Sequence, residues 1–434
     1  MATTEKFTAM NIAIENGRVI DPANNLDSST NIYIQDGKII HVGCNAPSGF
    51  NADKTIDASD KTVCPGIVDM SARLRDPGQS QKGTIKTETA AAAAAGITTI
   101  CCPPDTSPVI DTPSVVELIK SRQESTRMAK IVPLAAMTKK LEGQNISSMA
   151  SLKNAGCVGV SDGRKPIASS LVLRRAMQYA ATYDLKVFLS PFDPWLSENG
   201  CAHEGKISTR FGLPALPEAT ETAAIARDLA LVEQSGIKVH FNQLSTRQGA
   251  KLIAMGQKDG QKVTADVSAH QLFFTEDDLC GFDSSYHVRP PFRTNDDREG
   301  LREALKSDVI SAICSDHQPH EPDAKIGPFP TTEPGISAIE TLLPLVLRLV
   351  DEGVLELNTA IKKITAAPAE ILEIDAGTLS VGTAADVCVF DPDIEWTLTA
   401  DEMLSMGKNT PLLNTTLKGR ATHTIVDGRL VFER

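Results

Sequence analysis

Two kinds of hydrophobic pattern divide this chain, one at its ends and one in its middle. Near both ends, short stretches alternate apolar and polar residues, as half-buried strands do, and turn signals such as Asp427-Gly428 separate them. These stretches are residues 11–14, 31–35, 38–42, 385–391, 422–426 and 429–432. Because the two ends share this style, we expect one small β-sandwich domain formed by both termini, from residues 1–64 and 375–434.

The middle of the chain, residues 65–374, alternates short β-branched apolar runs with helical patterns, which is typical of parallel βα units. The eight runs lie at residues 68–70, 98–102, 131–136, 158–160, 187–189, 239–242, 265–267 and 310–314. The helical patterns between them include residues 90–95, 171–183, 218–234 and 297–306. Eight such units predict the α/β class and a (β/α)8 TIM-type barrel, with its chemistry just past the carboxyl ends of the strands.

Charge and composition exclude some classes of binding partner. The 434-residue chain has a net charge of -12 and a pI near 5.2, which argues against a nucleic-acid or anionic-membrane binder. The N-terminal MATTEKFTAM has no charged region followed by an apolar run, and no other segment is apolar for long enough to span a bilayer. The nine cysteines show no CxxC spacing, so we expect mostly buried, apolar thiols in a cytoplasmic protein.

The end of the first barrel strand carries the most specific motif. Alternation along a strand sends Ser71, Arg73 and Arg75 toward the barrel mouth. The following residues, Leu-Arg-Asp-Pro-Gly at 74–78, resemble those of dihydroorotases in the amidohydrolase superfamily. In that family a zinc-binding His-x-His pair precedes this sequence, and here Ser71 and Arg73 stand in its place.

The resemblance to dihydroorotases covers nearly the whole chain. Matching stretches are residues 96–99, 104–108, 290–293, 297–298, 315–320, 335–341, 377–379 and 382–386. The resemblance implies that Arg75 and His320 correspond to residues that grip the substrate carboxylate. Asp105 and Arg289 stand where the family has asparagines, which weakens this vestigial substrate site.

The resemblance also implies where zinc ligands belong. Ser190 stands where the family has a ligand histidine, Gln243 replaces a second one, and Asp162 and Asp316 survive. With Ser71 and Arg73, four imidazoles are missing, and neutral oxygens and a guanidinium replace them poorly as ligands of a divalent cation. We therefore expect no zinc or other cofactor, no catalytic residue beyond a vestigial Asp316, and no enzymatic activity.

Some chains that resemble dihydroorotase are inactive partners of aspartate carbamoyltransferase in pyrimidine synthesis. The resemblance thus implies a structural subunit needed for transferase assembly, with several copies of each chain in the complex. Two alternatives stay open. One is a weakly active or metal-independent cyclic amidohydrolase, and the other is a sensor that holds dihydroorotate or carbamoyl aspartate through Arg75 and His320.

Several side chains in these motifs can also be interpreted as structural residues without a role in a site. We expect Arg73 to neutralise Asp316, and also Asp162, in place of the metals; its alternative is a salt bridge in a filled mouth. His240 is expected in the core, whereas His317 is expected to share a vestigial site role with His320. Cys314 suits a buried apolar position better than that of a nucleophile, because no histidine is clearly placed to act as its base.

Overall fold

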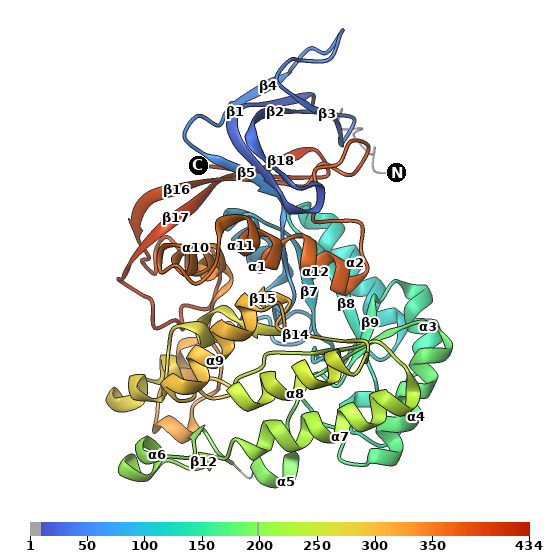
Figure 1. Ribbon diagram of the computed structural model, residues 1–434, viewed down its shortest axis with the longest axis vertical. Coiled ribbons are helices and arrows are strands. Elements are labelled where there is room, and N and C mark those ends of the chain that lie inside the picture. Colours follow the sequence, from blue (N-terminus) through green and yellow to red (C-terminus); the bar gives the residue numbers. More distant parts are fainter. Residues whose placement is uncertain (1–9, 198) are drawn as a thin grey trace.

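The computed structural model describes residues 10–197 and 199–434, so most of the N-terminal segment read for a targeting signal lies outside the described residues. A β-rich domain lies at one end of the molecule and a barrel forms the rest (Figure 1). Among the described residues no helix combines the length and apolarity needed to cross a bilayer. Seven of the nine cysteines are buried, as expected, and only Cys44 and Cys280 are exposed.

Both ends of the chain build the β-rich domain, which confirms that prediction. Its eight strands are hydrogen-bonded in the order β18-β17-β16-β5-β1-β2-β3, and β4 pairs with β1. The two ends meet where β5 pairs with β16 and Val63 lies opposite Val389. The strands are β1 (Ile12–Asp21), β2 (Leu26–Gln35), β3 (Lys38–Gly43), β4 (Lys54–Asp57), β5 (Thr62–Pro65), β16 (Val387–Thr397), β17 (Thr416–Val426) and β18 (Arg429–Glu433). Their buried isoleucines and valines form a core of this domain's own.

Eight parallel strands form a nearly closed barrel, as the pattern of the middle segment predicts. They are hydrogen-bonded in the order β15-β14-β13-β10-β9-β8-β7-β6, and a single bridge between Ala72 and His317 links the two edges. The strands are β6 (Ile67–Asp69), β7 (Ile97–Cys102), β8 (Lys130–Ala136), β9 (Gly159–Ser161), β10 (Lys186–Leu189), β13 (Val239–Phe241), β14 (Val263–Ser268) and β15 (Ala312–Cys314). Each predicted apolar run overlaps one of these strands, because a barrel strand is buried on both faces and needs no polar alternation.

Helices surround the barrel strands. They are α1 (Ile85–Ala94), α2 (Pro113–Thr126), α3 (Met149–Ala155), α4 (Ser170–Thr182), α7 (Ala219–Ser235), α8 (Arg247–Lys258), α9 (Asn295–Lys306), α10 (Leu342–Asp351), α11 (Leu357–Ile364) and α12 (Ala366–Leu372). Helix α1 holds the alanine run and contacts β17 of the β domain. Its small buried side chains allow this close packing, and Gly96 continues it, since a Cβ there would lie 2.4 Å from the Cys388 sulfur.

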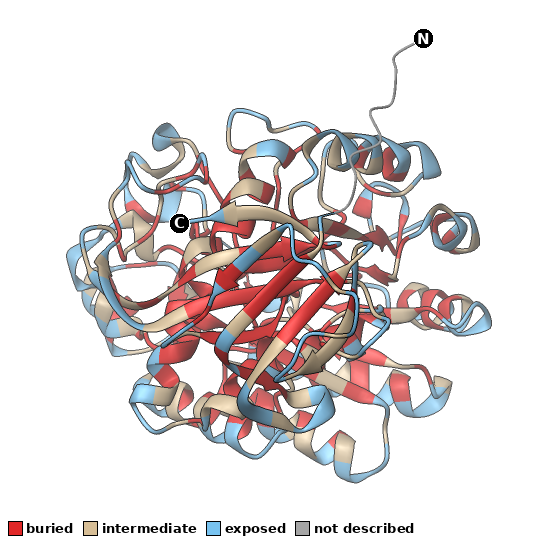
Figure 2. Ribbon diagram, turned by 90° about the horizontal axis from the view of Figure 1, so that it is seen from above, coloured by how far each residue is buried: buried red, intermediate tan, exposed pale blue. Residues whose placement is uncertain are grey.

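The segment between β10 and α7 was not predicted from the sequence. After β10 the chain forms α5 (Pro194–Ser197), β11 (Ala202–His203), α6 (Lys206–Phe211) and β12 (Ala215–Leu216) before α7 begins. This segment lies at the end of the molecule opposite the β domain (Figure 1). Its elements are too short to show a hydrophobic period. Viewed from the β-domain end, buried strands lie at the centre and exposed helix faces at the rim (Figure 2).

Short 3-10 helices lie in the loops of both domains. They are η1 (Pro22–Asn24), η2 (Lys139–Leu141), η3 (Ala269–Leu272), η4 (Glu276–Gly281), η5 (Ser284–Tyr286), η6 (Pro322–Lys325), η7 (Phe329–Thr331) and η8 (Ile339–Thr341). Most follow β14 and β15, so the loops after these two strands are long. They carry the segment with Arg289 and the segment with His320 toward the mouth.

Candidate functional site

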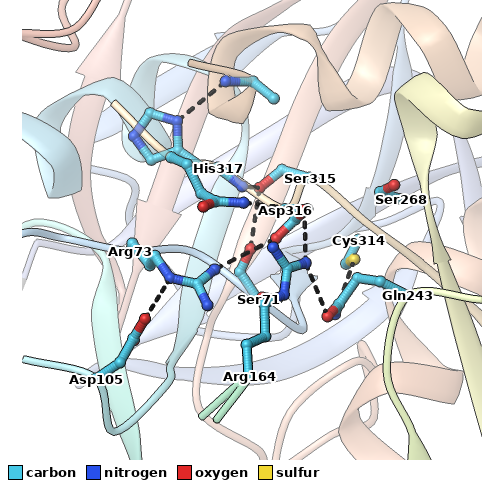
Figure 3. Close-up of polar contacts among 12 residues, drawn as sticks. Ser71, Arg73, Asp105, Arg164, Gln243, Ser268, Cys314, Ser315, Asp316 and His317 are labelled. Atoms are coloured by element: carbon cyan, nitrogen blue, oxygen red, sulfur yellow. Dashed lines mark hydrogen bonds and ion pairs between the residues drawn. The ribbon is translucent and has the colours of Figure 1, made fainter. Parts of the chain in front are cut away.

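Two arginines hold one carboxylate at the centre of the barrel mouth. Asp316 follows β15, and Arg73, after β6, approaches one of its oxygens at 3.4 Å. Arg164, from the loop after β9, lies 2.7 Å from the other oxygen and also donates to the side-chain oxygen of Gln243 at 3.1 Å. Figure 3 shows the two guanidinium groups approaching Asp316 from different strands. The Nε of Arg73 donates to Asp105 at 2.7 Å, so two cations and two acids form one connected cluster.

Burial makes this cluster depend on its internal pairing. Arg73 is 6% exposed and Asp316 is 2% exposed. Burial alone would lower the pKa of Arg73, but the charges of Asp105 and Asp316 outweigh it and raise that pKa above its ordinary value. Burial would likewise raise the pKa of Asp105, yet the Arg73 guanidinium holds it below the ordinary value. Asp105 is therefore paired with Arg73 and does not stand in the mouth as a free negative charge.

The hypothesis for Arg73 holds for Asp316 and fails for Asp162. Asp162 accepts the backbone N–H of Ser190 at 3.0 Å and that of Arg164 at 3.1 Å, and in the described part of the chain it forms no ion pair with Arg73. Burial raises the pKa of Asp162 to about 7, although those N–H groups favour the charged form. The second cation at Asp316 is Arg164, which the sequence reasoning missed as a site residue. Its signal was present, because residues 161–164 read Ser-Asp-Gly-Arg where the family reads Ser-Asp-Asp-Gly.

The remaining predicted metal positions lie around this cluster without donating to it. Ser71 is buried beside Arg73, and its carbonyl accepts the N–H of His317. The amide of Gln243 faces Asp266 and Cys314 as well as Arg164. Four mouth residues have left-handed backbone, which costs energy in residues other than glycine: Arg75 (φ 61°), Arg164 (φ 61°), Gln243 (φ 47°) and Asp316 (φ 49°). Such strain clusters at functional sites and persists here where the fold holds it.

Two histidines of the motifs belong to the core. His240 is fully buried between Thr264 and Asp266, which confirms its predicted place. His317 was expected to share a site role and does not. Its Nε2 lies 2.8 Å from Glu88 of α1, and its Nδ1 accepts the backbone N–H of Ala338. Because both ring nitrogens are engaged, His317 joins the barrel to its outer layer.

His320 does reach the mouth, beside Arg75. Their side-chain nitrogens are 3.0 Å apart, and Lys82 lies 3.3 Å from the other ring nitrogen of His320. Burial, together with the neighbouring cations, lowers the pKa of His320 far below its ordinary value, so the ring is neutral. Burial and the charge of Arg73 lower the pKa of Arg75 to about 10. The predicted pairing of Arg75 with His320 is therefore present, and Lys82 adds a cation that the sequence did not single out.

Arg289, the fourth predicted substrate residue, lies in a different pocket. Its guanidinium lies 4.5 Å from the ring centroid of Phe192, and both line a small pocket with Arg164 and Gln243. Arg75 and Asp105 line a separate cleft with Arg73. The four residues predicted to form one vestigial substrate site thus fall into two places.

Cys314 and His270 complete the mouth. Cys314 is buried near Asp316; burial raises the pKa of its thiol well above the ordinary value, and its sulfur lies within hydrogen-bond distance of Gln243 and Asp266. This environment confirms an inert thiol. His270, just after β14, was missed by the sequence reasoning. Burial lowers the pKa of its ring to about 4, and its Nδ1 has no hydrogen-bond partner among the described residues.

The donor set does not fit a pair of zinc ions. Zinc binds imidazole, thiolate and carboxylate groups, usually four at about 2 Å. The mouth offers serine and amide oxygens, guanidinium groups, carboxyl groups that are already paired or capped, and two imidazoles, of which His320 lies among cations and His270 has no described carboxylate as a partner. In residues 10–197 and 199–434 no three His, Cys, Asp or Glu side chains cluster in a way that suits a metal ion. The cations that contact Asp316 here are the guanidinium groups of Arg73 and Arg164.

The barrel, its terminal β domain and the strand-end motifs define an amidohydrolase. A family model described as dihydro-orotase-like matches residues 60–249, and one described as amidohydrolase family matches residues 331–432. A dihydroorotase-like protein of Pseudomonas aeruginosa is 48% identical over 98% of this chain and 100% of its own length. The dihydroorotase of Syntrophotalea carbinolica is 40% identical over 98% of this chain and 99% of its own length. The chain belongs to the dihydroorotase-like family.

Solved structures agree with this fold. The L-hydantoinase (dihydropyrimidinase) of Arthrobacter aurescens matches with a TM-score of 0.87 and 25% identity, covering 98% of this chain and 96% of that one. A D-hydantoinase matches with a TM-score of 0.83 at 21% identity, with the same coverage of the two chains, and shows the fold alone.

These comparisons correct the expectation that the chain is not an enzyme. Relatives that are 39–40% identical over 98% of the chain are named dihydroorotase, and the similar structures are hydantoinases, both hydrolytic enzymes. The error lay in treating the missing imidazoles as proof of inactivity. Loss of the imidazoles removes the ligands of a metal ion. It is no proof of inactivity, because the buried guanidinium groups of Arg73 and Arg164 can interact with a developing negative charge in the same mouth.

Proposed function

We propose that this chain is a zinc-independent amidohydrolase of the dihydroorotase type that works as a subunit in complex with aspartate carbamoyltransferase. The observation that supports the zinc-independent part is the double contact of Asp316 with Arg73 and Arg164. Two fixed guanidinium groups place cations near the positions that the resemblance assigns to metal, and both are paired with Asp316. Charge of this kind stabilises the oxyanion that develops when an amide carbonyl is attacked.

The substrate class is a cyclic amide, because the relatives named above are dihydroorotases and hydantoinases. Among the mouth residues, Asp162 is suited to exchange a proton near neutral pH, since burial raises its pKa to about 7. In this proposal Arg73 and Arg164 orient and stabilise the reacting amide. Asp162 takes a proton from the water that attacks the carbonyl carbon and returns a proton to the amide nitrogen as the C–N bond breaks.

The catalytic test is dihydroorotate turnover by the purified chain, alone and with the transferase, with and without a chelator. We expect turnover that is insensitive to the chelator and falls at least about tenfold in Arg164→Gln. Metal content of the same sample is measured in parallel. Stoichiometric zinc, turnover abolished by the chelator, or no turnover in either setting would each refute the catalytic part.

The assembly part rests on the resemblance of the strand-end motifs and has its own test. The chain and the transferase are run on a size-exclusion column separately and mixed. We expect co-elution in a complex with several copies of each chain. Separate elution with no change in the state of the transferase would refute assembly and leave the catalytic part standing.

A second candidate function is ligand sensing through Arg75. This side chain is largely buried, and no described carboxylate lies within ion-pair distance of it. Its Nε donates to the carbonyl of Pro319, and its terminal nitrogens face Gln79 and His320. Calorimetry with dihydroorotate or carbamoyl aspartate tests this function. Heat of binding without turnover would favour the sensor, and no heat with either compound would refute it.

A further inference from the structure

Two cysteines lie opposite each other where the two ends of the chain meet. Cys64 of β5 is the direct partner of Cys388 of β16 in this antiparallel strand pair. Both side chains are fully buried, and the structure holds both as thiols. The Cα atoms of directly opposite residues in such a pair are roughly 4.5–5.5 Å apart, and a disulfide needs roughly 4.4–6.8 Å. The backbones of β5 and β16 are therefore spaced for a disulfide between these two residues.

The two thiols also lie on the same face of the sheet and contact each other. Their hydrogen bond, together with burial, raises the pKa of the Cys64 thiol well above its ordinary value. Both cysteines belong to the apolar cluster of the barrel side, with Ile67, whereas the next residues along the strands, Val63 and Val389, belong to the core of the β domain. This is the alternation of regular strands, so the two sulfurs can join without a change of strand register.

The sulfur of Cys388 is held in place by the turn after α1. A Cβ at Gly96 would lie 2.4 Å from it, so a glycine is needed at that position. On the side away from Cys64, Cys388 lies opposite Thr424 of β17, whose hydroxyl donates to the carbonyl of Ala93 in α1. Close packing of this kind restricts the rotation of the Cys388 side chain. The sulfur therefore stays next to Cys64 in the folded chain.

Other cysteines of the barrel are not placed in this way. Cys101 and Cys102 are consecutive in β7, so their side chains point to opposite faces of the strand. They belong to two different apolar clusters, which keeps their sulfurs apart. Cys201 is buried in the segment between β10 and α7, and its thiol donates to the carbonyl of Pro214. Closeness in the sequence or burial alone thus does not bring two thiols together, whereas the register of β5 and β16 does.

A bond between these cysteines would enclose the whole barrel. Cys64 and Cys388 are 324 residues apart in the sequence, and all eight barrel strands lie between them. The chain passes from β5 through Gly66 into β6, the strand that ends beside Arg73. A disulfide would hold the two ends of the chain together even when β5 and β16 separate. A cross-link that closes a long loop stabilises the folded state mainly by restricting the unfolded chain.

We propose that Cys64 and Cys388 form a modification site at which a peroxide oxidises the two thiols to a disulfide that locks the β domain. One sulfur attacks the peroxide and becomes a sulfenic acid, and one water leaves. The other sulfur then attacks the sulfenic sulfur; the S–S bond forms, the S–O bond breaks, and the hydroxyl leaves as a second water with the remaining thiol proton. The two thiols are oxidised by two electrons, and the peroxide is reduced to water.

Burial sets the condition under which this reaction proceeds. A buried, protonated thiol reacts slowly, so the attack on peroxide requires a local separation of β5 and β16. Such openings occur in folded proteins without global unfolding. The site thus records exposure to peroxide over time, and the link then prevents further opening at this position. The inference depends neither on the proposed hydrolysis nor on the transferase.

The experiment uses the full native chain and hydrogen peroxide. After treatment, the remaining thiols are alkylated, the chain is digested without reductant, and linked peptides are identified by mass spectrometry. We expect a peptide pair that joins Cys64 to Cys388, forms within hours and is separated by dithiothreitol. The closed loop should migrate faster on a non-reducing denaturing gel, and the melting temperature should rise by at least about 3 °C. No such link in the native chain, or a link that forms only in denaturant, would refute the site.

Three variants locate the link. Cys64→Ala and Cys388→Ala should each abolish the gel shift and the rise in melting temperature, because each leaves one thiol without its partner. Either variant is sufficient, so the second covers the case in which the first does not fold. Cys201→Ser is the matched control, since this thiol is also buried and a serine hydroxyl can donate to Pro214 in its place; the gel shift should be unchanged. A gel shift that persists in the alanine variants, or that is lost in the control, would overturn the assignment.

Discussion

Two parts of the barrel mouth differ in whether their arginines have acidic partners. In the paired half, Arg73 and Arg164 share Asp105 and Asp316 at 2.7–3.4 Å. In the open half, Arg289 lies on Phe192, and no described acid pairs with it. Both halves lie in loops at the carboxyl ends of strands of one barrel. The barrel therefore does not decide by itself whether a buried cation is compensated; the residues of each loop do.

The contrast teaches what each half is suited for. A buried ion pair with additional hydrogen bonds resists rearrangement, because removing one partner strands the other in a low-dielectric site. A buried cation without a partner gains energy from any anion that reaches it. The paired half thus holds two cations in fixed, neutralised positions, whereas Arg289 in the open half stays available to an anion.

The largest predicted effect comes from breaking the paired half. Arg73→Ala leaves Asp105 and Asp316 short of a cation, and we expect a loss of about 3–5 kcal/mol in the free energy of unfolding. Thermal and denaturant unfolding measure this loss. The control is Arg18→Ala, which removes an exposed pair with Asp27 and should cost less than about 1 kcal/mol. Equal losses in the two variants would mean that burial adds nothing to the pairing.

A smaller effect concerns pH. The pKa of Asp162 is about 7 in the folded chain and ordinary, near 3.8, in the unfolded chain. Between these values the folded state holds a proton that the unfolded state has released, so the contribution of Asp162 to stability falls as pH rises from about 4 to 7. Relative to Asp162→Asn, the wild type should lose more than about 1 kcal/mol between pH 5 and pH 8. Parallel stability curves for the two proteins would contradict the raised pKa.

A still smaller effect is expected in the open half. Arg289→Gln removes a cation that has no acidic partner, so it should change the free energy of unfolding by no more than about 1 kcal/mol, the size of a cation–π contact. Urea unfolding of this variant beside Arg73→Ala gives the direct contrast between the two halves. A loss as large as that of Arg73→Ala would reveal a partner for Arg289 and remove the distinction.

The smallest expected effect is that of a chelator. A metal that binds only the folded state adds stability in proportion to its occupancy, and its removal lowers the melting temperature. Because guanidinium groups stand among the predicted ligand positions, we expect the same melting temperature with and without a chelator. A clear decrease on chelation would show that a metal supports the mouth.

Sequence patterns predicted the elements well where they are long or fully buried. The apolar runs that became β7 and β8 and the helical period of α4 lie close to their predicted positions. The segment with α5 and α6 was missed because such short elements show no period and are held by tertiary contacts. Motif matching also led to the wrong conclusion that the chain is not an enzyme. A motif shows which residues differ from the family, but it does not show which other side chains lie in the same place in the folded chain.

Within the site, the sequence by itself determined which residue types stand at the strand ends and that imidazoles are absent from the four positions. Pairing was decided by tertiary structure alone, because Arg164 and Asp316 are 152 residues apart and meet only through barrel closure. Closure also sent His317 into the core and separated Arg289 from Arg75. Spacing along a strand gives the direction of a side chain, but the distance between two charges, and hence their energy, depends on how the loops of different strands fold together.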